Sequence, residues 1–327
     1  MKAKILKILK DRNDFISGQE LCETFNVSRT AIWKAVKALK DEGYEIESVT
    51  NKGYRLMDSP DILSKPEIEN YLNTQKIAKE LKVFSVIDST NLECKRIAEN
   101  GDFVDGTLVV ADRQDAGRGR RGRSWECPAG INIAMSLLLK PDIAPDKASM
   151  LTIVMAMAVA KATMRASGLD VKIKWPNDIL LNKKKFCGIL TEMSVEFDYI
   201  HYVVIGVGIN VNQLVFPEEI KDIATSIKLQ NDKEISRAQL VAFVMEEFED
   251  LYEKFLNTQN LENLIEEYNN LLISLNSEVR VLDPKGEFTG ISKGINSEGE
   301  LIVELDDGRE VNVFAGEVSV RGIYGYV

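Results

Sequence analysis

The sequence is poor in the residues on which metal sites and membrane spans depend. Its 327 residues include a single histidine, His201, and four cysteines that lie far apart and form no CxxC pair. This set does not suit a structural zinc site, and no metal-binding residues are predicted. The most apolar stretch, residues 150–160, is shorter than the roughly 20 residues that a membrane span requires. Because no cleavable signal pattern begins the sequence either, we expect a cytoplasmic protein without a membrane partner.

An overall excess of positive charge is also missing. The formal net charge is -10, which excludes a protein that coats nucleic acid or anionic membrane with its whole surface. Any binding of anions must therefore be local. Hydrophobic residues make up 45% of the chain and charged residues 28%, as in ordinary soluble globular proteins. The length predicts two or three domains.

The N-terminal residues 1–58 are predicted to form a winged helix-turn-helix domain. Apolar residues at helical spacing predict helices at residues 2–10, 19–25 and 28–39. The turn around Asn51-Lys52-Gly53 then predicts a pair of strands. Two short helices joined by a tight turn and followed by a hairpin are typical of this DNA-binding arrangement.

The charge of this segment supports contact with DNA. Residues 1–57 carry eleven Lys or Arg against eight Asp or Glu, a net +3 within an acidic chain. A helical interaction module without DNA contact remains the alternative. The candidates for the DNA recognition face are Ser28, Arg29, Thr30 and Lys34.

Two changes of pattern mark the other domain boundaries. The polar linker at residues 58–61 ends the first domain, and residues 62–273 then alternate strands with helices. From Ser274 the pattern changes to five short strands with tight turns, which predicts an SH3-like β-barrel over residues 274–327. The expected fold class is therefore α+β multidomain. The last domain is expected to have a covering or docking role.

Residues 112–125, here called the arginine loop, are the most unusual stretch of the chain. Four arginines and three glycines fall within residues 117–123, directly after a strand predicted at 107–111. Guanidinium groups stay charged and glycines leave the backbone mobile, so the segment is either a solvated loop or an anion-binding one. The glycines match GxGxxG, but Pro128 and Gly130 work against the helix that a dinucleotide site needs next.

Other motifs suggest what the anion could be. Joining a carboxylate to ATP brings two anions together, and fixed cations must cancel their repulsion at the reacting atoms. The arginine loop, the KWPND run at residues 174–178 and Lys185 could supply these cations, and a closing loop would exclude water. Taken alone, the lysines at 183–185 could equally be a solvated turn, and the DSTN turn at 88–91 could merely cap a helix.

The combined motifs resemble those of biotin protein ligases, specifically the bifunctional type that also represses the biotin operon. The resemblance covers essentially the whole chain. Its most specific parts are the GRGRRGR and KWPND runs together. It comprises DSTN at 88–91, GRGRRGR at 117–123, KWPND at 174–178, KFCGIL at 185–190, GVGINVN at 206–212 and GEVSVR at 316–321, with the N-terminal DNA-binding domain.

The resemblance implies a central mixed-sheet domain related to class II aminoacyl-tRNA synthetases. It also implies an activity: biotin and Mg-ATP form biotinyl-5'-AMP, and biotin then passes to a lysine of the biotin carboxyl carrier protein of acetyl-CoA carboxylase. ATP, Mg²⁺ and biotin are thus the expected ligands. Operator DNA is the expected second partner, bound by a homodimer that the adenylate promotes.

The resemblance also implies roles for individual residues. Arg120 and Lys185 would be catalytic, with Lys185 bridging the biotin carboxylate and the α-phosphate. Trp125 would be an apolar lid near the adenine. The biotin-binding residues would be Ser89, Thr90, Asn91, Gln114, Arg118, Gly119, Arg120 and Lys185. The ATP-binding residues would be Arg118, Arg121, Arg123, Trp125, Asn177, Asp178, Asn210 and Arg321.

Two other functions remain open at this point. A transcription regulator that senses a small acid without ligase activity would need the same DNA-binding domain. A lipoate protein ligase would perform the same chemistry on a different acid.

Overall fold

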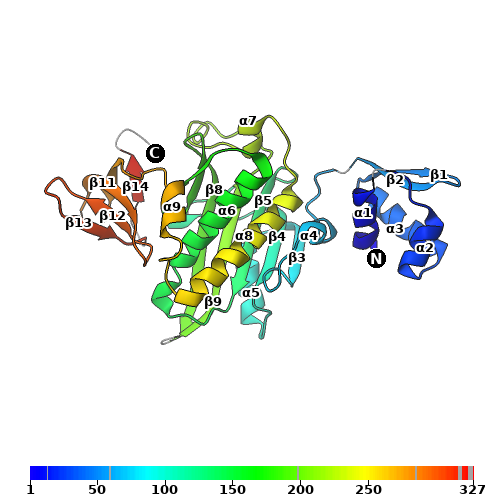
Figure 1. Cartoon of the computed structure of the whole chain (residues 1–327), viewed down its shortest axis with the longest axis horizontal. Coiled ribbons are helices and arrows are strands. Elements are labelled where there is room, and N and C mark those ends of the chain that lie inside the picture. Colours follow the sequence, from blue (N-terminus) through cyan, green and yellow to red (C-terminus); the bar gives the residue numbers. More distant parts are fainter. Residues whose placement is uncertain (13, 59, 197–198, 284–285, 316–318, 323–326) are drawn as a thin grey trace.

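A computed structural model describes residues 1–327 except 13, 59, 197–198, 284–285, 316–318 and 323–326. Three units follow one another along the longest axis of the molecule (Figure 1). The N-terminal unit lies at one end, a large central unit lies in the middle, and the C-terminal unit lies at the other end. The two chain termini are therefore far apart.

The N-terminal unit has the helices and strands of a winged helix-turn-helix. Ser28 begins the third helix by accepting a hydrogen bond from the backbone N–H of Ala31 at 3.3 Å, as its position in the sequence predicts. Eleven buried apolar residues give this unit a hydrophobic core of its own. Its elements are α1 (Lys2–Asp11), α2 (Gly18–Phe25), α3 (Arg29–Asp41), β1 (Glu45–Val49) and β2 (Gly53–Asp58).

The helix α4 (Lys65–Tyr71) joins the N-terminal unit to the central one. Ser64 caps it, and Pro66 lies in its first turn, as expected. Glu67 is only 2% exposed and receives hydrogen bonds from Lys10 and Tyr44 of the N-terminal unit. The Nζ of Lys10 lies 2.5 Å from its carboxylate. The N-terminal unit is thus seated on α4 through a buried carboxylate. Ser59 of the predicted linker lies outside the described residues.

The central unit is built on a seven-stranded mixed sheet in the order β3-β4-β5-β9-β8-β7-β6. β3 and β4 are parallel, and the other neighbours are antiparallel. This arrangement confirms the predicted mixed sheet. The strands are β3 (Leu81–Ile87), β4 (Thr107–Gln114), β5 (Asn132–Leu139), β6 (Val171–Lys174), β7 (Asp178–Leu181), β8 (Lys184–Glu196) and β9 (Tyr199–Asn210).

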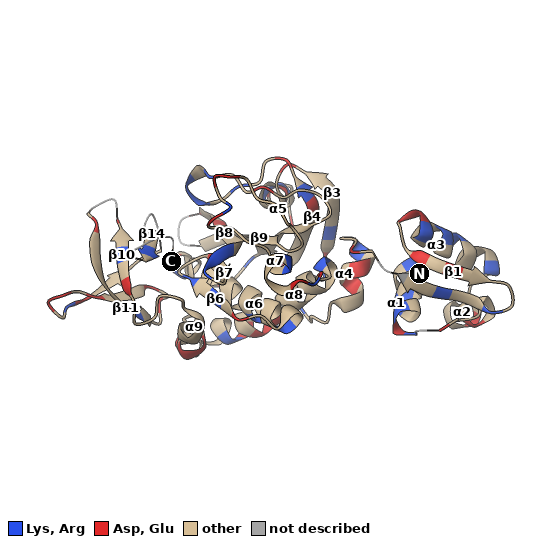
Figure 2. Ribbon diagram, turned by 90° about the horizontal axis from the view of Figure 1, so that it is seen from above, with Lys and Arg blue, Asp and Glu red and all other residues tan. Residues whose placement is uncertain are grey.

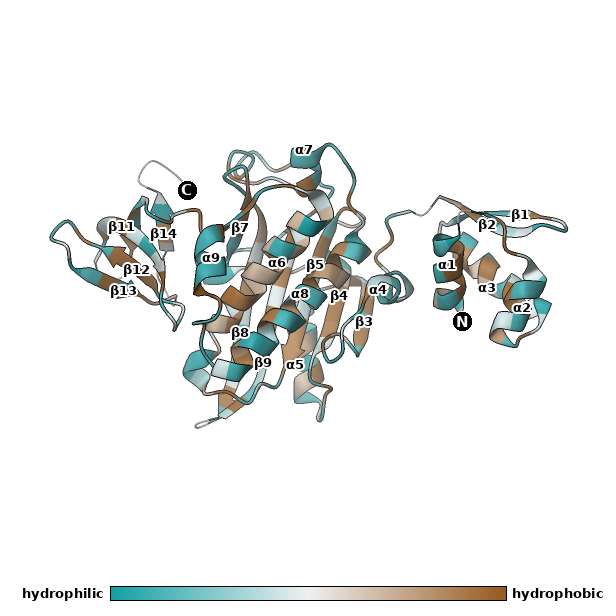
Figure 3. Cartoon of the chain, in the orientation of Figure 1, coloured by the Kyte–Doolittle hydropathy of each residue, from teal (hydrophilic) through white to brown (hydrophobic). Residues whose placement is uncertain are grey.

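Helices cover both faces of this sheet. The helices α6 (Met150–Ser167) and α8 (Arg237–Thr258) pack on one face within the large core, and α5 (Thr90–Glu99) packs on the other (Figure 1). All eight residues of β5 are therefore buried. The central strands are largely hydrophobic, whereas short helices such as α7 (Ile227–Asn231) and α9 (Ile265–Leu271) are mostly hydrophilic (Figure 3).

The helix α6 is apolar around its whole circumference. In the described part of the chain, the helical stretch at residues 145–167 is the one that is long and apolar enough to cross a membrane. It is 72% buried inside the protein, between the sheet and α8. Its composition is thus explained by its place in the core.

The C-terminal unit is a five-stranded antiparallel sheet in the order β13-β12-β11-β10-β14, in agreement with the predicted small β-domain. Part of the predicted turn at 284–286 and residues 316–318 of the GEVSVR motif lie outside the described residues. The strands are β10 (Glu278–Leu282), β11 (Phe288–Ile295), β12 (Leu301–Glu304), β13 (Glu310–Val313) and β14 (Ser319–Gly322).

Candidate active site

Two pockets adjoin beneath the arginine loop, over the strands β8 and β9. The first has about 460 Å³ of empty space, which includes open solvent at its mouth, and lies against the DSTN turn. The second has about 1490 Å³, likewise with open solvent included, and extends toward the segment that follows β9. The residues that line both pockets are Gly119, Arg120, Trp125, Asn177 and Lys185.

Glycines make the floor of the first pocket. Gly188 of β8 and Gly206 and Gly208 of β9 bring bare backbone to the surface of the sheet. A Cβ atom at Gly206 would overlap the side chain of Asn91, and one at Gly208 would overlap the indole of Trp125. The GxGxN pattern is therefore explained by close packing, which allows side chains to lie flat on the strands.

Neutral polar groups from the DSTN turn and β4 close the inner end of the first pocket. Ser89 is the N-cap residue of α5, but its side chain makes no cap hydrogen bond. The Thr90 backbone N–H donates to Gln114 Oε1 at 2.8 Å, and the Thr90 hydroxyl lies 3.0 Å from the same oxygen. This fixes the Gln114 amide, so that its Nε2 hydrogens point elsewhere.

Asn91 lines the same pocket, but its amide is engaged within the protein. Its Nδ2 donates to Glu192 Oε2 at 2.8 Å, and its Oδ1 lies 2.6 Å from Ser136 Oγ. Sequence reasoning missed Ser136 and Glu192. The one signal for Ser136 is a hydroxyl within the apolar part of the strand β5. Glu192 carries no signal, because it follows the KFCGIL motif as an ordinary acidic residue.

The arginine loop folds over the pockets as a small hairpin. Gly119 N–H donates to Arg123 O at 2.7 Å, and Trp125 N–H donates to Gly117 O at 2.9 Å. The side chains of Arg118, Arg121 and Arg123 are exposed at the pocket rims, whereas Arg120 is half-buried. The two interpretations of the arginine loop, as a solvated segment and as an anion-binding one, are therefore compatible. The loop is exposed, and it also presents cations to two pockets.

Arg120 ties the arginine loop to two other parts of the chain. Its guanidinium donates to Asn177 Oδ1 at 2.6 Å and to the carbonyl oxygen of Ala315 in the C-terminal unit at 2.7 Å. Burial lowers the pKa of Arg120, while Asp178 opposes that shift. Arg120 therefore holds the loop, the KWPND run and the C-terminal unit in one arrangement.

Lys185 lies at the junction of the two pockets. Its Nζ is 2.5 Å from Asp178 Oδ1 and 5.6 Å from the centre of the Trp125 ring. Lys174 lies nearby, and its pKa is lowered to about 8. Burial is the largest cause of this shift, Asp178 opposes it, and the positive charges of Arg321, Lys185 and Arg123 add to it. Such a concentration of cations favours an incoming polyanion.

The far wall of the second pocket comes from the segment after β9. Asn210 closes that strand and donates to Thr225 O at 3.2 Å. Phe216, Ile220 and Ile223 present apolar surface to the pocket, and Ile220 and Ile223 are 38% and 40% exposed. The sequence pattern predicted no site residue in this segment. Its only signal is apolar residues in a loop that contains proline.

Two of the predicted ATP-binding residues do not line the second pocket. Arg118 lines the first pocket only. Arg321 lines neither of the two. It lies on β14 and lines a third cavity, of about 960 Å³, together with Lys174 and Trp175. Arg121, Arg123, Trp125, Asn177, Asp178 and Asn210 all line the second pocket. The positive charge of Arg321 lowers the pKa of Lys174.

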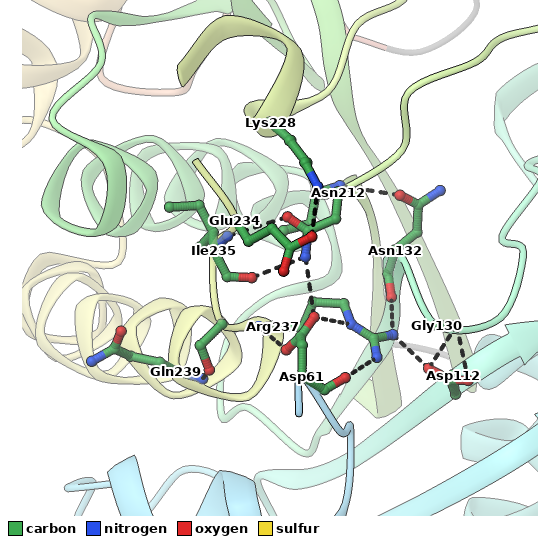
Figure 4. A network of polar contacts seen from close by, with 12 residues as sticks. Asp61, Asp112, Gly130, Asn132, Asn212, Lys228, Glu234, Ile235, Arg237 and Gln239 are labelled. Atoms are coloured by element: carbon green, nitrogen blue, oxygen red, sulfur yellow. Dashed lines mark hydrogen bonds and ion pairs between the residues drawn. The ribbon is translucent and has the colours of Figure 1, made fainter. Parts of the chain in front are cut away.

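A buried arginine anchors the segments that frame the second pocket (Figure 4). Arg237, 1% exposed, donates from Nε to Asp61 Oδ2 at 2.7 Å and from its terminal nitrogens to Asp112, Asn132 O and Asp61 O. Asp112 begins the arginine loop and also accepts from Gly130 N–H at 3.0 Å. Asn212 donates to Asp61 Oδ2 at 3.1 Å. Linker, loop and post-β9 segment thus share one anchor.

The predicted DNA-contacting residues lie together at the start of α3. Ser28, Arg29, Thr30 and Lys34 are all exposed. Trp33 beside them is 53% exposed, and the Lys37 ammonium lies 5.4 Å from its ring. Lys and Arg residues follow one another along α3 in Figure 2. The helix therefore presents a basic and partly aromatic face to solvent.

The pockets fit a neutral polar ring and a nucleotide. Hydroxyl and amide groups at the inner end of the first pocket suit an uncharged urea-like ring, and the cations around the second pocket suit phosphates. The indole Nε1 of Trp125 is buried without a hydrogen-bond partner, at the point where the pockets join. Within the described ranges, no group of three His, Cys, Asp or Glu residues could hold a metal ion.

Three family profiles match successive parts of the chain. Residues 2–55 match the HTH domain, residues 83–210 match the Biotin/lipoate A/B protein ligase family, and residues 274–321 match the Biotin protein ligase C terminal domain. Their order is that of the three units of the structure.

Individual proteins agree with these matches. The chain is 41% identical to the bifunctional ligase/repressor BirA of Bacillus subtilis over 90% of this chain and 91% of that protein. It is 31% identical to BirA of Escherichia coli over 97% and 96% of the two chains. A biotin protein ligase from Aquifex aeolicus, solved in complex with biotin and ATP, matches with a TM-score of 0.66 and 30% identity over 75% of this chain and 99% of that one. The chain therefore belongs to the biotin protein ligase family, in its bifunctional ligase and repressor branch.

Proposed function

We propose that this protein activates biotin with ATP to biotinyl-5'-AMP and transfers biotin to a lysine of a carrier protein. The observation that carries the proposal is the junction of the two pockets at Lys185. A pocket for a neutral ring adjoins a larger cationic pocket, so that a carboxylate and a phosphate would meet beside one ammonium group. The resemblance to ligases that bind biotin and ATP supports the identity of the two ligands.

We assign the first pocket to biotin. Ser89, Thr90 and Gln114 would bind the ureido group, Asn91 would support them, and the glycine floor would receive the flat bicyclic ring. Arg118, Gly119 and Arg120 would close over the valerate chain. Because a neutral urea has both donors and acceptors, hydroxyl and amide side chains suit it better than charges do.

We assign the second pocket to ATP. Arg121 and Arg123 would contact phosphates, and Trp125 would cover the adenine together with the apolar residues of the post-β9 segment. Asn177, Asp178 and Asn210 would hold the nucleotide from the sheet side, and Arg321 would act through its charge. Mg²⁺ would bind through the phosphates and neutralise their charge, as it usually does with nucleotides.

The reaction needs no nucleophile from the protein. A biotin carboxylate oxygen attacks the α-phosphorus of ATP, and the bond to the β,γ-phosphates breaks, which releases pyrophosphate. The carrier lysine amine then attacks the acyl carbon of the mixed anhydride, and AMP leaves. Lys185 and Arg120 stabilise the negative charge that both anions bring to the reacting atoms. The arginine loop keeps water from hydrolysing the anhydride.

We further propose that residues 1–58 bind operator DNA and that residues 62–273 and 274–327 form the ligase. The protein would act in the cytoplasm as a homodimer whose formation the ligand promotes. The four free cysteines support a reducing compartment. The carrier would be the biotin carboxyl carrier protein of acetyl-CoA carboxylase, because related chains are named as ligases of that enzyme. The exposed α3 face supports DNA contact through Ser28, Arg29, Thr30 and Lys34.

The ligase proposal is tested by incubating the protein with biotin, Mg²⁺ and ATP. We expect pyrophosphate release and a protein-bound adenylate that a carrier domain discharges. Lipoate in place of biotin tests the lipoate ligase alternative, and preferential activation of lipoate would contradict our assignment of the first pocket.

The DNA proposal is tested by gel shift on DNA upstream of biotin synthesis or transport genes, with and without biotin and ATP. Lys34→Ala should weaken binding and reduce its salt dependence by about one counterion, because it removes one phosphate contact. Its ligase activity should equal that of the wild type. A pure sensing function would leave DNA binding intact and produce no adenylate.

A further inference from the structure

A chain of hydrogen bonds leads from the inner end of the first pocket to Glu192 on β8. Asn91 Nδ2 donates to Glu192 Oε2 at 2.8 Å, and Ser136 Oγ lies 2.6 Å from Asn91 Oδ1. Ser136 Oγ also lies 2.7 Å from Thr90 Oγ1, which faces the pocket. Lys95 Nζ holds the second oxygen of Glu192 at 2.7 Å. Glu192 is outside every motif that describes the site.

The carboxylate fixes the direction of every hydrogen bond in this chain. An ionised carboxylate only accepts, so the amide of Asn91 must turn its Nδ2 to Glu192 and its Oδ1 to Ser136. The Ser136 hydroxyl must then donate its one hydrogen to Asn91 Oδ1. Burial raises the pKa of Glu192, but hydrogen bonds from Lys95 and Asn91 outweigh burial and keep the pKa below its ordinary value.

The direction of the chain decides what Thr90 offers to a ligand. Ser136 Oγ lies within donating distance of Thr90 Oγ1, at 2.7 Å, as well as of Asn91 Oδ1, but its one hydrogen can serve only one of them. A hydrogen given to Asn91 is not given to Thr90, and Thr90 donates its own hydrogen to Gln114 Oε1 at 3.0 Å. The Thr90 oxygen then keeps its lone pairs for the pocket. An uncharged side chain at position 192 would let the Asn91 amide turn over, and Ser136 could then donate to Thr90 instead.

We propose that Glu192 is a positioning residue that, through Asn91 and Ser136, holds Thr90 as a hydrogen-bond acceptor for a ring N–H of biotin. The inference rests on the proposed function, because it assumes that a ureido ring occupies the first pocket. Glu192 does not touch the ligand in this role. It selects ligands whose ring presents an N–H toward Thr90, and Lys95 holds the carboxylate in place.

The test compares Glu192→Gln with wild type in adenylate formation. We expect the KM for biotin to rise about tenfold, the effect of losing one hydrogen bond, while kcat and the KM for ATP change less than twofold. Lys95→Met, which leaves the carboxylate but frees it, should raise the KM for biotin by a smaller factor. Glu196→Gln, an exposed glutamate on the same strand, is the matched control and should have no effect.

Ligand analogues separate positioning from general damage to the pocket. Desthiobiotin keeps the ureido ring, whereas 5-(thiolan-2-yl)pentanoic acid lacks it, and both are tested as competitors. Glu192→Gln should weaken desthiobiotin about tenfold and leave the second compound unchanged. An unchanged KM for biotin, or equal losses for both compounds, would overturn the inference. Calorimetry of biotin binding to the wild type and to Glu192→Gln gives the same comparison without turnover. A wild type that binds biotin but forms no adenylate would therefore contradict the ligase function and leave the inference about Glu192 testable.

Discussion

Lys185 lines both pockets at their junction, as does a second cation, Arg120. Lys185 is the second residue of β8, just after the turn that joins β7 to β8. Its ammonium nitrogen lies 2.5 Å from a carboxylate oxygen of Asp178 on β7. Lys185→Met should lower kcat for adenylate formation by about a hundredfold or more, as loss of a transition-state charge partner does. Pyrophosphate release measures this. Lys183→Met, in the exposed turn, is the control, and an equal loss there would contradict the assignment.

Arg120 is held by two charge-assisted hydrogen bonds, one to Asn177 Oδ1 and one to the carbonyl oxygen of Ala315. Arg120→Gly removes the bonds to Asn177 and to Ala315 O, so the arginine loop should open more often. We expect the bound adenylate to escape at least tenfold faster and to label lysines of a bystander protein. Labelled adenylate retained on gel filtration measures the escape. Arg113→Gln, an exposed arginine paired with Asp115, should retain adenylate as wild type does.

At the scale of residues, sequence reasoning located the charged and motif-borne parts of the site but missed the groups behind them. The arginines, Lys185 and the DSTN turn stand out because their residue types or spacing are unusual, and the structure brings them to two adjoining pockets. Ser136 and Glu192 do not stand out, because their importance comes from contacts with Asn91 of the helix α5, which is far from both in sequence. Arg321 carries the right charge, but lies in a third cavity.

At the scale of elements, the strands β8 and β9 act as a flat support for the site. A Cβ atom at Gly208 would overlap the Trp125 indole, so the ring must shift and carry the arginine loop with it. Gly208→Ala should raise the KM for biotin and for ATP at least tenfold, and should lower stability by about 1–3 kcal/mol, as overpacking does.

Steady-state kinetics and thermal unfolding measure the two effects of Gly208→Ala separately. Ile205→Val, a buried change on the same strand, should cost about 1 kcal/mol without changing either KM. Similar KM changes in both variants would mean that the strand, rather than the overlap with Trp125, controls binding.

Elements with strong periodicity were predicted well, and elements whose form depends on packing were not. The helices of the N-terminal unit, the strand β5 and the helices α6 and α8 agree with their sequence patterns within a few residues. The β8–β9 hairpin is longer at its outer end than its apolar pattern indicates, because the strands continue beyond the core into solvent. The short helix α7 was not predicted, since five residues carry too little periodicity.

At the scale of the whole molecule, Arg237 joins three segments around a single buried charge. Arg237→Met would leave Asp61 and Asp112 without their shared partner, and should lower the free energy of unfolding by about 3–5 kcal/mol. Denaturant unfolding measures this. Arg165→Met removes a partly exposed pair with Glu246, together with a contact to Phe243, and should cost about 1 kcal/mol. Equal costs would show that burial of the Arg237 network adds nothing.

The seating of the N-terminal unit on Glu67 has a geometric consequence for DNA. Lys10 and Tyr44 hold the unit against α4 through a carboxylate that is 2% exposed, so the linker alone does not set its position. If the protein forms the proposed homodimer, two units held this way would fix the distance between the two α3 helices. Such a dimer would bind half-sites at one spacing, and inserting about five base pairs, half a helical turn, would place one half-site on the wrong side of the duplex.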